Sequence, residues 1–444
     1  YFLVKRFTGN STKAGLYALL FAGLSFHTTL FSVAPRIHAF TFFATILVLW
    51  FSFRLLQNKS FKNYLLAFGS VAIAFSVSQN GATTFVIPLL AHFFDNENRK
   101  WKFNNYKYYL DKKLIYGILL FVLLVTTLGY PKILVSVFQL SMPIKDCLAL
   151  FTASQVTQTF GLSNFFGYLK HYFLNIDLIA TWLICAAAFY MFFKKKIKLA
   201  LKLEPYDIMA IANIIVFLLV FGSTSIISDR FAMVMFPSLF FLTSRLAVQL
   251  EQKRRVFYPL VFLIVIYLYG WGNLTAIALG GDTREMAVNY LLKNTNGKDA
   301  ILGNLDKNFL GITATPESIR AGTTGPSGTS DELIAEKNMV SPDSRNYFYL
   351  DSRTDKNSWP DPKPFKYAVV AANEANLYTV KKYLSENGFV VVKSFFAKYN
   401  ENDTGSADII PWDMVTPPIF HLLPVKLGEF KALGPNIFIF QKID

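Results

Sequence analysis

The sequence predicts an α-helical polytopic membrane bundle followed by a small extracytoplasmic α/β domain. Of the 444 residues, 53% are hydrophobic and 45 are Phe, which is far more apolar than the core of a soluble protein requires. Basic residues gather in alternate loops between the apolar runs. After Gly281 long apolar runs give way to alternating strands and helices. We therefore expect a helical bundle over 1–280 and an α/β domain over 281–444.

The first region contains about nine apolar runs. A membrane-crossing helix needs about 20 apolar residues, and fewer when it packs inside a bundle. The predicted spans are 14–34, 37–56, 63–78, 81–94, 114–135, 174–193, 206–227, 231–249 and 256–274. The third and fourth runs are short and are broken at Gln79-Asn80-Gly81. They predict either a helical hairpin or one kinked span, so the count of nine varies by one or two.

The charge distribution predicts the orientation. Up to Gly280 there are 26 Lys and Arg against 9 Asp and Glu, whereas from Gly281 there are 18 against 20. The basic residues of the first region divide 21 to 5 between alternating loops. The positive-inside rule places the rich loops in the cytoplasm and the domain after Gly280 outside. We expect a multi-pass protein of the plasma (inner) membrane, and the loop positions favour topology over nucleic-acid binding as the reason for the charge.

The C-terminal region predicts a small α/β domain of about 160 residues. Helices are expected at 285–292 and at 375–387, the second ending at Gly388. Strands are expected at 300–303, 367–372, 389–393 and 436–441.

Familiar enzyme motifs are absent from the sequence. There is no HExxH, CxxC, Walker A, GxGxxG or GxSxG pattern. The two cysteines, Cys147 and Cys185, exclude a disulfide framework. No cofactor is indicated, and a divalent metal is compatible with the sequence but supported by no ligand cluster. The Gly-rich stretch 322–328 has no following Lys and is interpreted as a connector.

Two arginines at the outer ends of spans are candidates for a phosphate site. Arg36 begins the second predicted span, and Arg230 stands at the outer junction before 231–249. A guanidinium holds a phosphate bidentately and stays charged. The alternative for Arg36 is a side chain reaching to the membrane interface. The alternative for Arg230 is an ion pair with Asp229 or Asp177.

Other outer residues are weaker candidates. Asp177 and Asp229 are candidates for a general base or metal ligand, with a helix N-terminal charge or an ion pair as the alternative. His38 is a candidate donor to a phosphate or sugar hydroxyl. The candidate substrate-binding residues, each with a plain structural alternative, are Gln79, Asn80, Lys170 and His171.

Two local stretches resemble the C-type glycosyltransferase superfamily, and more narrowly its bacterial protein O-mannosyltransferase and aminoarabinose transferase relatives. Ala34-Pro35-Arg36-Ile37-His38-Ala39-Phe40 is similar to the family's small–x–Arg–x–x–aromatic segment. Asp229-Arg230-Phe231 with Pro237 is similar to its Arg–aromatic…Pro segment. The layout of a bundle followed by an outer α/β domain also resembles the family over most of the chain.

The resemblance implies a membrane glycosyltransferase that moves a hexosyl or pentosyl group from a polyprenyl-phosphate sugar to a glycan, lipid or protein acceptor in the cell envelope. By the resemblance Arg36 and Arg230 hold the lipid phosphate, and the catalytic base lies on the first outer loop; His38, two residues from Arg36, is added to the lipid-phosphate candidates by its position. Because the chain opens at Tyr1 in what reads as an inter-span loop, we expect that base upstream of it. A departing phosphate at the bilayer surface needs fixed positive charge, which agrees with this layout.

Two other functions compete with the transferase. One is a polysaccharide or lipid transporter or flippase, which would carry polar groups at mid-membrane and an internal repeat. The other is a non-catalytic membrane protein whose outer domain binds a ligand. The scarcity of mid-span charges and the lack of a visible repeat favour the transferase.

Overall fold

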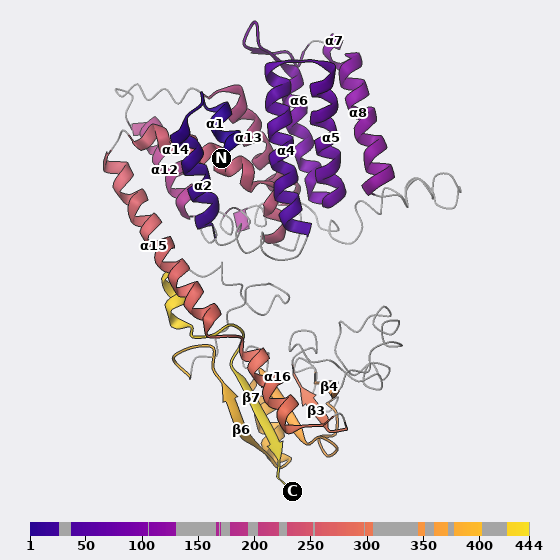
Figure 1. Cartoon of the computed structure of the whole chain (residues 1–444), viewed down its shortest axis with the longest axis vertical. Helices are drawn as coiled ribbons and strands as arrows, with labels where there is room; N and C mark the ends of the chain where they lie inside the picture. The colour runs from indigo at the N-terminus through magenta and orange to yellow at the C-terminus, as the bar shows by residue number, and fades with distance from the viewer. Residues whose placement is uncertain are drawn as a thin grey trace, which may run out of the picture. The chain divides into compact units, whose positions relative to one another are not determined.

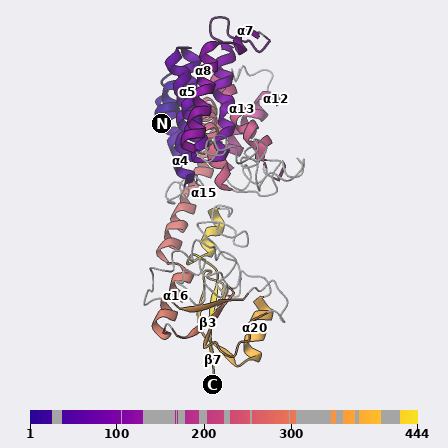
Figure 2. The same cartoon turned by 90° about the vertical axis from the view of Figure 1, so that its right-hand side faces the viewer.

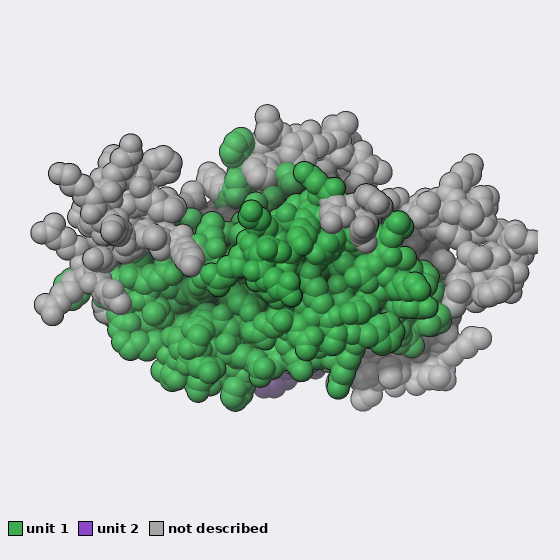
Figure 3. Space-filling view, turned by 90° about the horizontal axis from the view of Figure 1, so that it is seen from above, with its two compact units in different colours: residues 1–265 green, residues 266–444 purple. Residues whose placement is uncertain are grey.

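The structure is a computed structural model of the whole chain. It describes residues 1–25, 37–104, 106–129, 166–167, 169, 178–193, 203–221, 229–251, 254–296, 298–304, 345–350, 359–371, 377–401 and 424–443. The chain divides into two compact units, residues 1–265 and 266–444 (Figure 3). Each unit is described separately below.

Unit 1 is helical (Figure 1). Its elements in chain order are α1 (Phe2–Phe7), α2 (Thr12–Leu24), α4 (Ile37–Gln57), α5 (Phe61–Val77), η1 (Gln79–Phe85), α6 (Val86–Phe93), α7 (Tyr106–Tyr109), α8 (Lys112–Leu124), η2 (Val125–Gly129), α12 (Leu178–Phe193), α13 (Pro205–Phe221), η4 (Asp229–Val234), α14 (Phe236–Glu251) and the start of α15 (Arg254–Leu279). The strands β1 (Phe94–Asp95) and β2 (Lys100–Trp101) form a short antiparallel pair between α6 and α7.

The core of unit 1 forms where α4 and α5 pack against each other and against α6, α8 and α14. Fully buried aromatic side chains of both helices, including Phe53, Tyr64 and Phe68, fill this interface. The serine side chains that precede α2 and α5 accept the backbone N–H groups of Ala14 and Asn63, which caps both helices. Each buried ring contributes about 25 cal/mol per Å² of apolar surface removed from water.

One end of unit 1 is rich in basic side chains, and we call it the basic end. Asp95 in β1 pairs with Lys102 after β2, and these hydrogen bonds hold the pKa of Asp95 well below its usual range. Lys59, in the turn between α4 and α5, donates to the His92 carbonyl at 2.5 Å, and burial lowers the pKa of Lys59. Lys113 donates to the Lys59 carbonyl at 3.0 Å. The two bonds at Lys59 tie the turn between α4 and α5 to the end of α6 and to the start of α8.

A buried histidine completes the basic end. The His92 ring lies 2.9 Å from the Tyr108 carbonyl through Nε2 and 2.5 Å from the Tyr64 hydroxyl through Nδ1. A carbonyl only accepts, so Nε2 carries the proton and Nδ1 accepts from Tyr64. His92 is thereby a satisfied structural residue.

The prediction of a nine-span polytopic bundle is wrong. Among the described residues, two helices are long and apolar enough to cross a membrane, Ala39–Gln57 within α4 and Tyr258–Ile277 within α15. Other apolar runs form shorter helices, such as α2 with 13 residues and α6 with eight. At about 1.5 Å per residue, 13 residues cover about 20 Å of a hydrocarbon layer about 30 Å thick. Many apolar residues of these short helices fill the core of unit 1 instead. Hydropathy along the chain does not distinguish a core residue from one in contact with lipid.

The two long apolar helices support association with a membrane. Exposed apolar side chains point the same way. Leu119 of α8, Leu219 of α13 and Phe262 of α15 are each about half exposed or more. A water-facing surface rarely carries such large exposed apolar side chains on several helices.

Unit 2 is built on a five-stranded mixed sheet with the order β4-β3-β5-β7-β6. The strands are β3 (Ala300–Gly303), β4 (Asn346–Tyr349), β5 (Tyr367–Ala371), β6 (Phe389–Phe395) and β7 (Ile437–Lys442). β3 pairs in parallel with β4 and β5, whereas β7 pairs antiparallel with β5 and β6. A bulge interrupts the β6–β7 register between Val391 and Lys393.

Helices cover both faces of this sheet (Figure 2). Alternate residues of β5 point to opposite faces. Val369 packs with α16 (Thr283–Asn294), and Val370 packs with α20 (Leu377–Glu386). The all-buried pattern of β5 follows from this three-layer arrangement.

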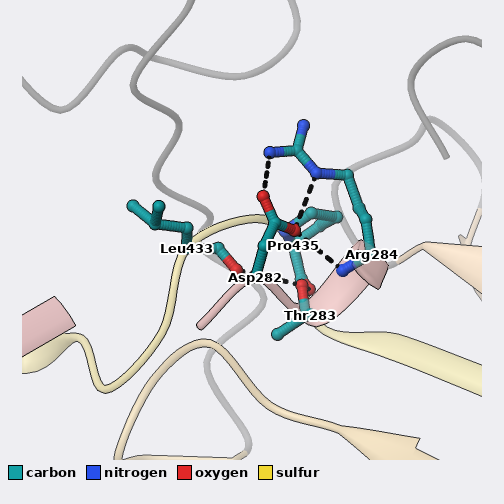
Figure 4. Close-up of polar contacts among 5 residues, drawn as sticks. All are labelled: Asp282, Thr283, Arg284, Leu433 and Pro435. Atoms are coloured by element: carbon teal, nitrogen blue, oxygen red, sulfur yellow. Dashed lines mark hydrogen bonds and ion pairs between the residues drawn. The ribbon is translucent and has the colours of Figure 1, made fainter. Parts of the chain in front are cut away.

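The start of α16 is fastened to the segment before β7 (Figure 4). Asp282 caps the helix by accepting the Arg284 backbone N–H at 2.8 Å and pairs with the Arg284 guanidinium at 2.5 Å. The Thr283 hydroxyl reaches the carbonyls of Leu433 at 3.1 Å and Pro435 at 2.7 Å. These bonds link residues about 150 positions apart in sequence.

The sequence and the structure agree on the small α/β unit. Strands occur where alternation predicts them, at β3, β5, β6 and β7, and α16 and α20 occupy the expected helical stretches. β4 is not predicted, because its sequence Asn-Tyr-Phe-Tyr lies between turn-rich loops. The structure shows it as a strand because it pairs in parallel with β3.

Candidate functional site

Three elements meet at the end of unit 1 opposite the basic end, which we call the far end. η1 and η4 contact each other, and both contact α4. α4 runs away from the far end, because its C-terminal residues are tied to the basic end. The start of α4 with His38, the start of η1 with Asn80 and the start of η4 with Arg230 therefore share one region of the bundle.

η1 is held tightly against the end of α5. A Cβ atom at Gly81 would lie 2.2 Å from the Ala74 carbonyl oxygen, so a residue with a side chain cannot fit there. The Gly81 N–H bonds the Ser78 carbonyl at 2.8 Å. The hydroxyls of Thr83 and Thr84 donate to the carbonyls of Asn80 and Gly81, which satisfies backbone acceptors inside the bundle. Asn80 is 9% exposed and begins this buried turn.

η4 is anchored by a buried amide from α13. Asn213 Nδ2 donates to the Val234 carbonyl at 3.2 Å and to Ser238 Oγ at 3.0 Å. Asn213 is fully buried, and its Oδ1 has no hydrogen-bond partner within the described ranges. The amide fixes the end of η4 against the start of α14.

An apolar groove lies along α4 toward the same region. It measures about 470 Å³ and is walled by side chains of α1, α2, α4 and α14. Phe42, in the second turn of α4, and Phe240 of α14 face each other across 6.4 Å between ring centroids. Pro237, the second residue of α14, also lines the groove. The groove therefore joins the start of α14 and the first turns of α4.

The sequence-predicted site residues fall into three groups. Asn80 lies in η1, with its side chain described. His38, Gln79, Asp229 and Arg230 lie in α4, η1 and η4, but the structure describes their backbone positions and not their side chains. The predicted residues outside the described ranges are Arg36, Lys170, His171 and Asp177.

The far end of unit 1 therefore brings together the starts of α4, η1 and η4, and the apolar groove runs along α4 toward it. A long apolar chain fits the groove, because its walls are almost entirely apolar. A charged headgroup would then lie at the starts of α4, η1 and η4. Within the described residues no group of three His, Cys, Asp or Glu side chains lies close enough to hold a metal ion.

Sequence reasoning missed Asn213 and the groove. Asn213 interrupts the apolar run Ile211-Ala212-Asn213-Ile214-Ile215, and a single amide in such a run signals a buried polar contact. The groove has no sequence signal, because its walls come from four helices and consist of ordinary core residues.

No protein-family model, curated protein or solved structure matches this chain.

Proposed function

We propose that the chain is a membrane glycosyltransferase that takes a sugar from a polyprenyl-phosphate donor and passes it to an acceptor at the membrane surface. The lipid phosphate is assigned to the far end of unit 1, near Arg230 and His38.

The observation that carries the proposal is the apolar groove between α4 and α14. A polyprenyl chain is long, apolar and uncharged, and its phosphate is anionic. The groove offers apolar walls of matching character, and its lining includes Pro237 at the start of α14, the helix that follows η4. A guanidinium there would neutralise the charge that develops on the leaving phosphate.

The proposed topology uses the two long apolar helices. α4 ends at the basic end, and α15 begins with Arg254 and Arg255. The positive-inside rule then places the basic end in the cytoplasm. The far end of unit 1 and the domain after α15 lie on the outer side, which is where a lipid-linked sugar is transferred in this proposal.

The experiment is transfer of radiolabelled sugar from a polyprenyl-phosphate donor by the full-length protein in liposomes. We expect Arg230→Ala, and likewise Arg36→Ala, to lower transfer by about 100-fold or more, because removing one donor to a developing anion has that effect. The matched control is Arg99→Asn. Arg99 is exposed at the basic end with φ of 49°, a conformation that Asn accepts.

A second pair of variants tests the groove. Ala22 lines the groove, so Ala22→Phe adds a ring there. Gly23→Phe is the control, because it adds the same ring at the next residue, where an added Cβ meets no atom within 4 Å. We expect Ala22→Phe to raise KM for a long-chain donor and to spare a short-chain analogue with the same headgroup. Full transfer by Arg36→Ala, Arg230→Ala and Ala22→Phe would contradict the proposal.

A further inference from the structure

Unit 1 has a second cavity, at its basic end, that the proposed transferase function does not use. It measures about 380 Å³, which lies in the size range of small-molecule sites. Its walls come from the turn between α1 and α2, the start of α13 and the last turns of α14. The polar side chains that line it include Thr8, Ser11, Glu204, Arg245 and Gln249.

This cavity is remote from the candidate lipid-phosphate region. Gln57, the last residue of α4, donates to the Tyr206 hydroxyl at 3.0 Å in the cavity wall. The candidate region lies at the other end of α4, which has 21 residues. At about 1.5 Å per residue, the two places are separated by about 30 Å. A ligand in this cavity is therefore distinct from the proposed donor headgroup.

The charges around the cavity leave one carboxylate uncompensated. Arg245 pairs with Asp207 at 2.8 Å, and the Asp207 carboxylate also accepts the Glu204 backbone N–H at 2.9 Å. Glu204 lines the cavity, and its carboxylate has no ion-pair partner among the residues that the structure describes. The carboxylates of Glu204 and Asp207 thus outnumber the Arg245 guanidinium at this cavity. This charge balance makes the cavity attractive to a cation, although the surrounding end of the bundle is basic.

The cavity also offers a buried acceptor without a donor. Gln249 lines the cavity, and its Oε1 atom is buried with no hydrogen-bond partner in the described part of the chain. Buried carbonyl oxygens are normally paired, because leaving one unpaired costs its full desolvation. A ligand that brings N–H donors would satisfy both this oxygen and the Glu204 carboxylate.

The apolar walls suit an ammonium group as well. The rings of Phe7 and Tyr206 both line the cavity, with centroids 5.4 Å apart and planes inclined by 52°. Aromatic faces attract cations, most strongly where water is excluded. The combination of an aromatic pair, a carboxylate and an unpaired amide oxygen is what a primary ammonium requires, because it carries charge and three N–H donors.

We propose that this cavity binds the primary ammonium group of a small amine, supplied either by a free amine or by the ethanolamine headgroup of a lipid. The ammonium lies beside the contacting rings of Phe7 and Tyr206 and donates to the Glu204 carboxylate. It also donates to Gln249 Oε1, which a small turn of the amide brings to the cavity surface. Arg245, neutralised by Asp207, closes the wall.

The test is isothermal titration of ethanolamine into the full-length protein in detergent that contains no ethanolamine lipid. We expect saturable binding that Glu204→Gln weakens by about tenfold or more, since it removes the charge and keeps the shape. The matched control is Glu251→Gln. Glu251 is two residues beyond Gln249 on the same helix, pairs with Lys13 at 2.9 Å and does not line the cavity, so binding should not change.

A second variant separates binding from folding. Gln249→Met keeps the size of the side chain and removes the unpaired oxygen. We expect the unliganded Tm to stay the same or rise while ethanolamine binding weakens, a combination that a purely structural Gln would not produce. Absence of saturable binding to the unchanged protein, or binding unaffected by both Glu204→Gln and Gln249→Met, would overturn the proposal.

Nanodiscs distinguish the two sources of the amine. If a lipid headgroup occupies the cavity, phosphatidylethanolamine nanodiscs should raise Tm above that in phosphatidylglycerol nanodiscs, and Glu204→Gln should remove the difference. If the ligand is a free amine, Tm should be equal in the two lipids and rise when ethanolamine is added. No Tm rise from either source would overturn the proposal.

Discussion

At the scale of single residues, buried polar groups decide how the ends of unit 1 are built. His92 and Tyr64 satisfy each other inside the basic end, and Asn213 fixes η4 at the far end. Both are polar residues within apolar runs, and both owe their role to partners that are distant in sequence. Hydrogen bonds to His92 and to Asn213 Nδ2 offset much of the cost of burying these side chains, whereas Asn213 Oδ1 has no partner among the described residues.

The ion pair of Asp95 with Lys102 makes the β1–β2 region sensitive to acid. The hydrogen bond from Lys102 holds the pKa of Asp95 below that of the unfolded chain. The pair's stabilisation is therefore fully present above about pH 4, the pKa of an unperturbed Asp, and is lost as pH falls toward the folded-state pKa. We expect Asp95→Asn to lower Tm at pH 7 and to flatten the loss of Tm below about pH 4.

Thermal unfolding of the full-length protein in detergent between pH 7 and pH 2.5 measures this effect. Lys102→Met should flatten the profile in the same way, because it removes the cause of the lowered pKa. A profile that is as steep in both variants as in the unchanged protein would show that other groups control the acid response.

At the scale of elements, the approach of η1 to α5 depends on one glycine. Gly81→Ala would place a Cβ atom 2.2 Å from the Ala74 carbonyl oxygen, so η1 has to move. We expect a loss of about 2–4 kcal/mol in the free energy of unfolding, the range of an overpacked core position or larger. Chemical denaturation in detergent, followed by tryptophan fluorescence, measures it.

Gly23→Ala is the matched control for Gly81→Ala. Gly23 lies in α2, and an added Cβ there meets no atom within 4 Å. Because Ala favours a helix over Gly by about 1 kcal/mol, this variant should be neutral or stabilising. Equal effects of the two substitutions would show that the packing of η1 is not the cause.

At the scale of the whole molecule, the direction of the two long apolar helices predicts which side of the membrane each part of the chain faces. The basic end is expected inside, and the domain after α15 outside. Exposed residues for labelling are Lys112 at the start of α8 and Tyr378 in α20. Each is replaced by Cys after Cys147 and Cys185 have been changed to Ser.

A membrane-impermeant maleimide applied to intact cells should label Tyr378→Cys at once. Lys112→Cys should react only after the membrane is permeabilised. If both positions react from the same side, α4 and α15 do not place the two ends across a membrane, and the topology used in the proposed function fails.

How much the sequence predicted differs between the two units. In unit 2, alternation and turn residues located β3, β5, β6 and β7, because these local signals coincide with the final strands. In unit 1, apolar runs located helices but not their lengths or their environment. Phe53 and Phe68 are buried in the core of unit 1. A linear hydropathy pattern counts them as lipid-facing, because it records only that they are apolar.

The candidate site shows the same division. The sequence drew attention to Asn80, Asp229 and Arg230 through their positions at the ends of apolar runs. Three features depend on contacts between segments that are distant in sequence. They are the meeting of η1, η4 and α4, the anchoring of η4 by Asn213, and the groove walled by α1, α2, α4 and α14. No local pattern encodes such contacts.

The sequence by itself determined the apolar character of the first region, the clustering of basic charge and the α/β alternation of the second. These are properties of composition and local period, and they persist whatever the packing is. The tertiary structure alone decided that two helices among the described residues have the length of a membrane span, that an apolar groove runs along α4, and that a polar cavity lies near the C-terminal end of α4. Helix ends and cavities arise where separate segments pack, so they become visible only when those segments are placed together.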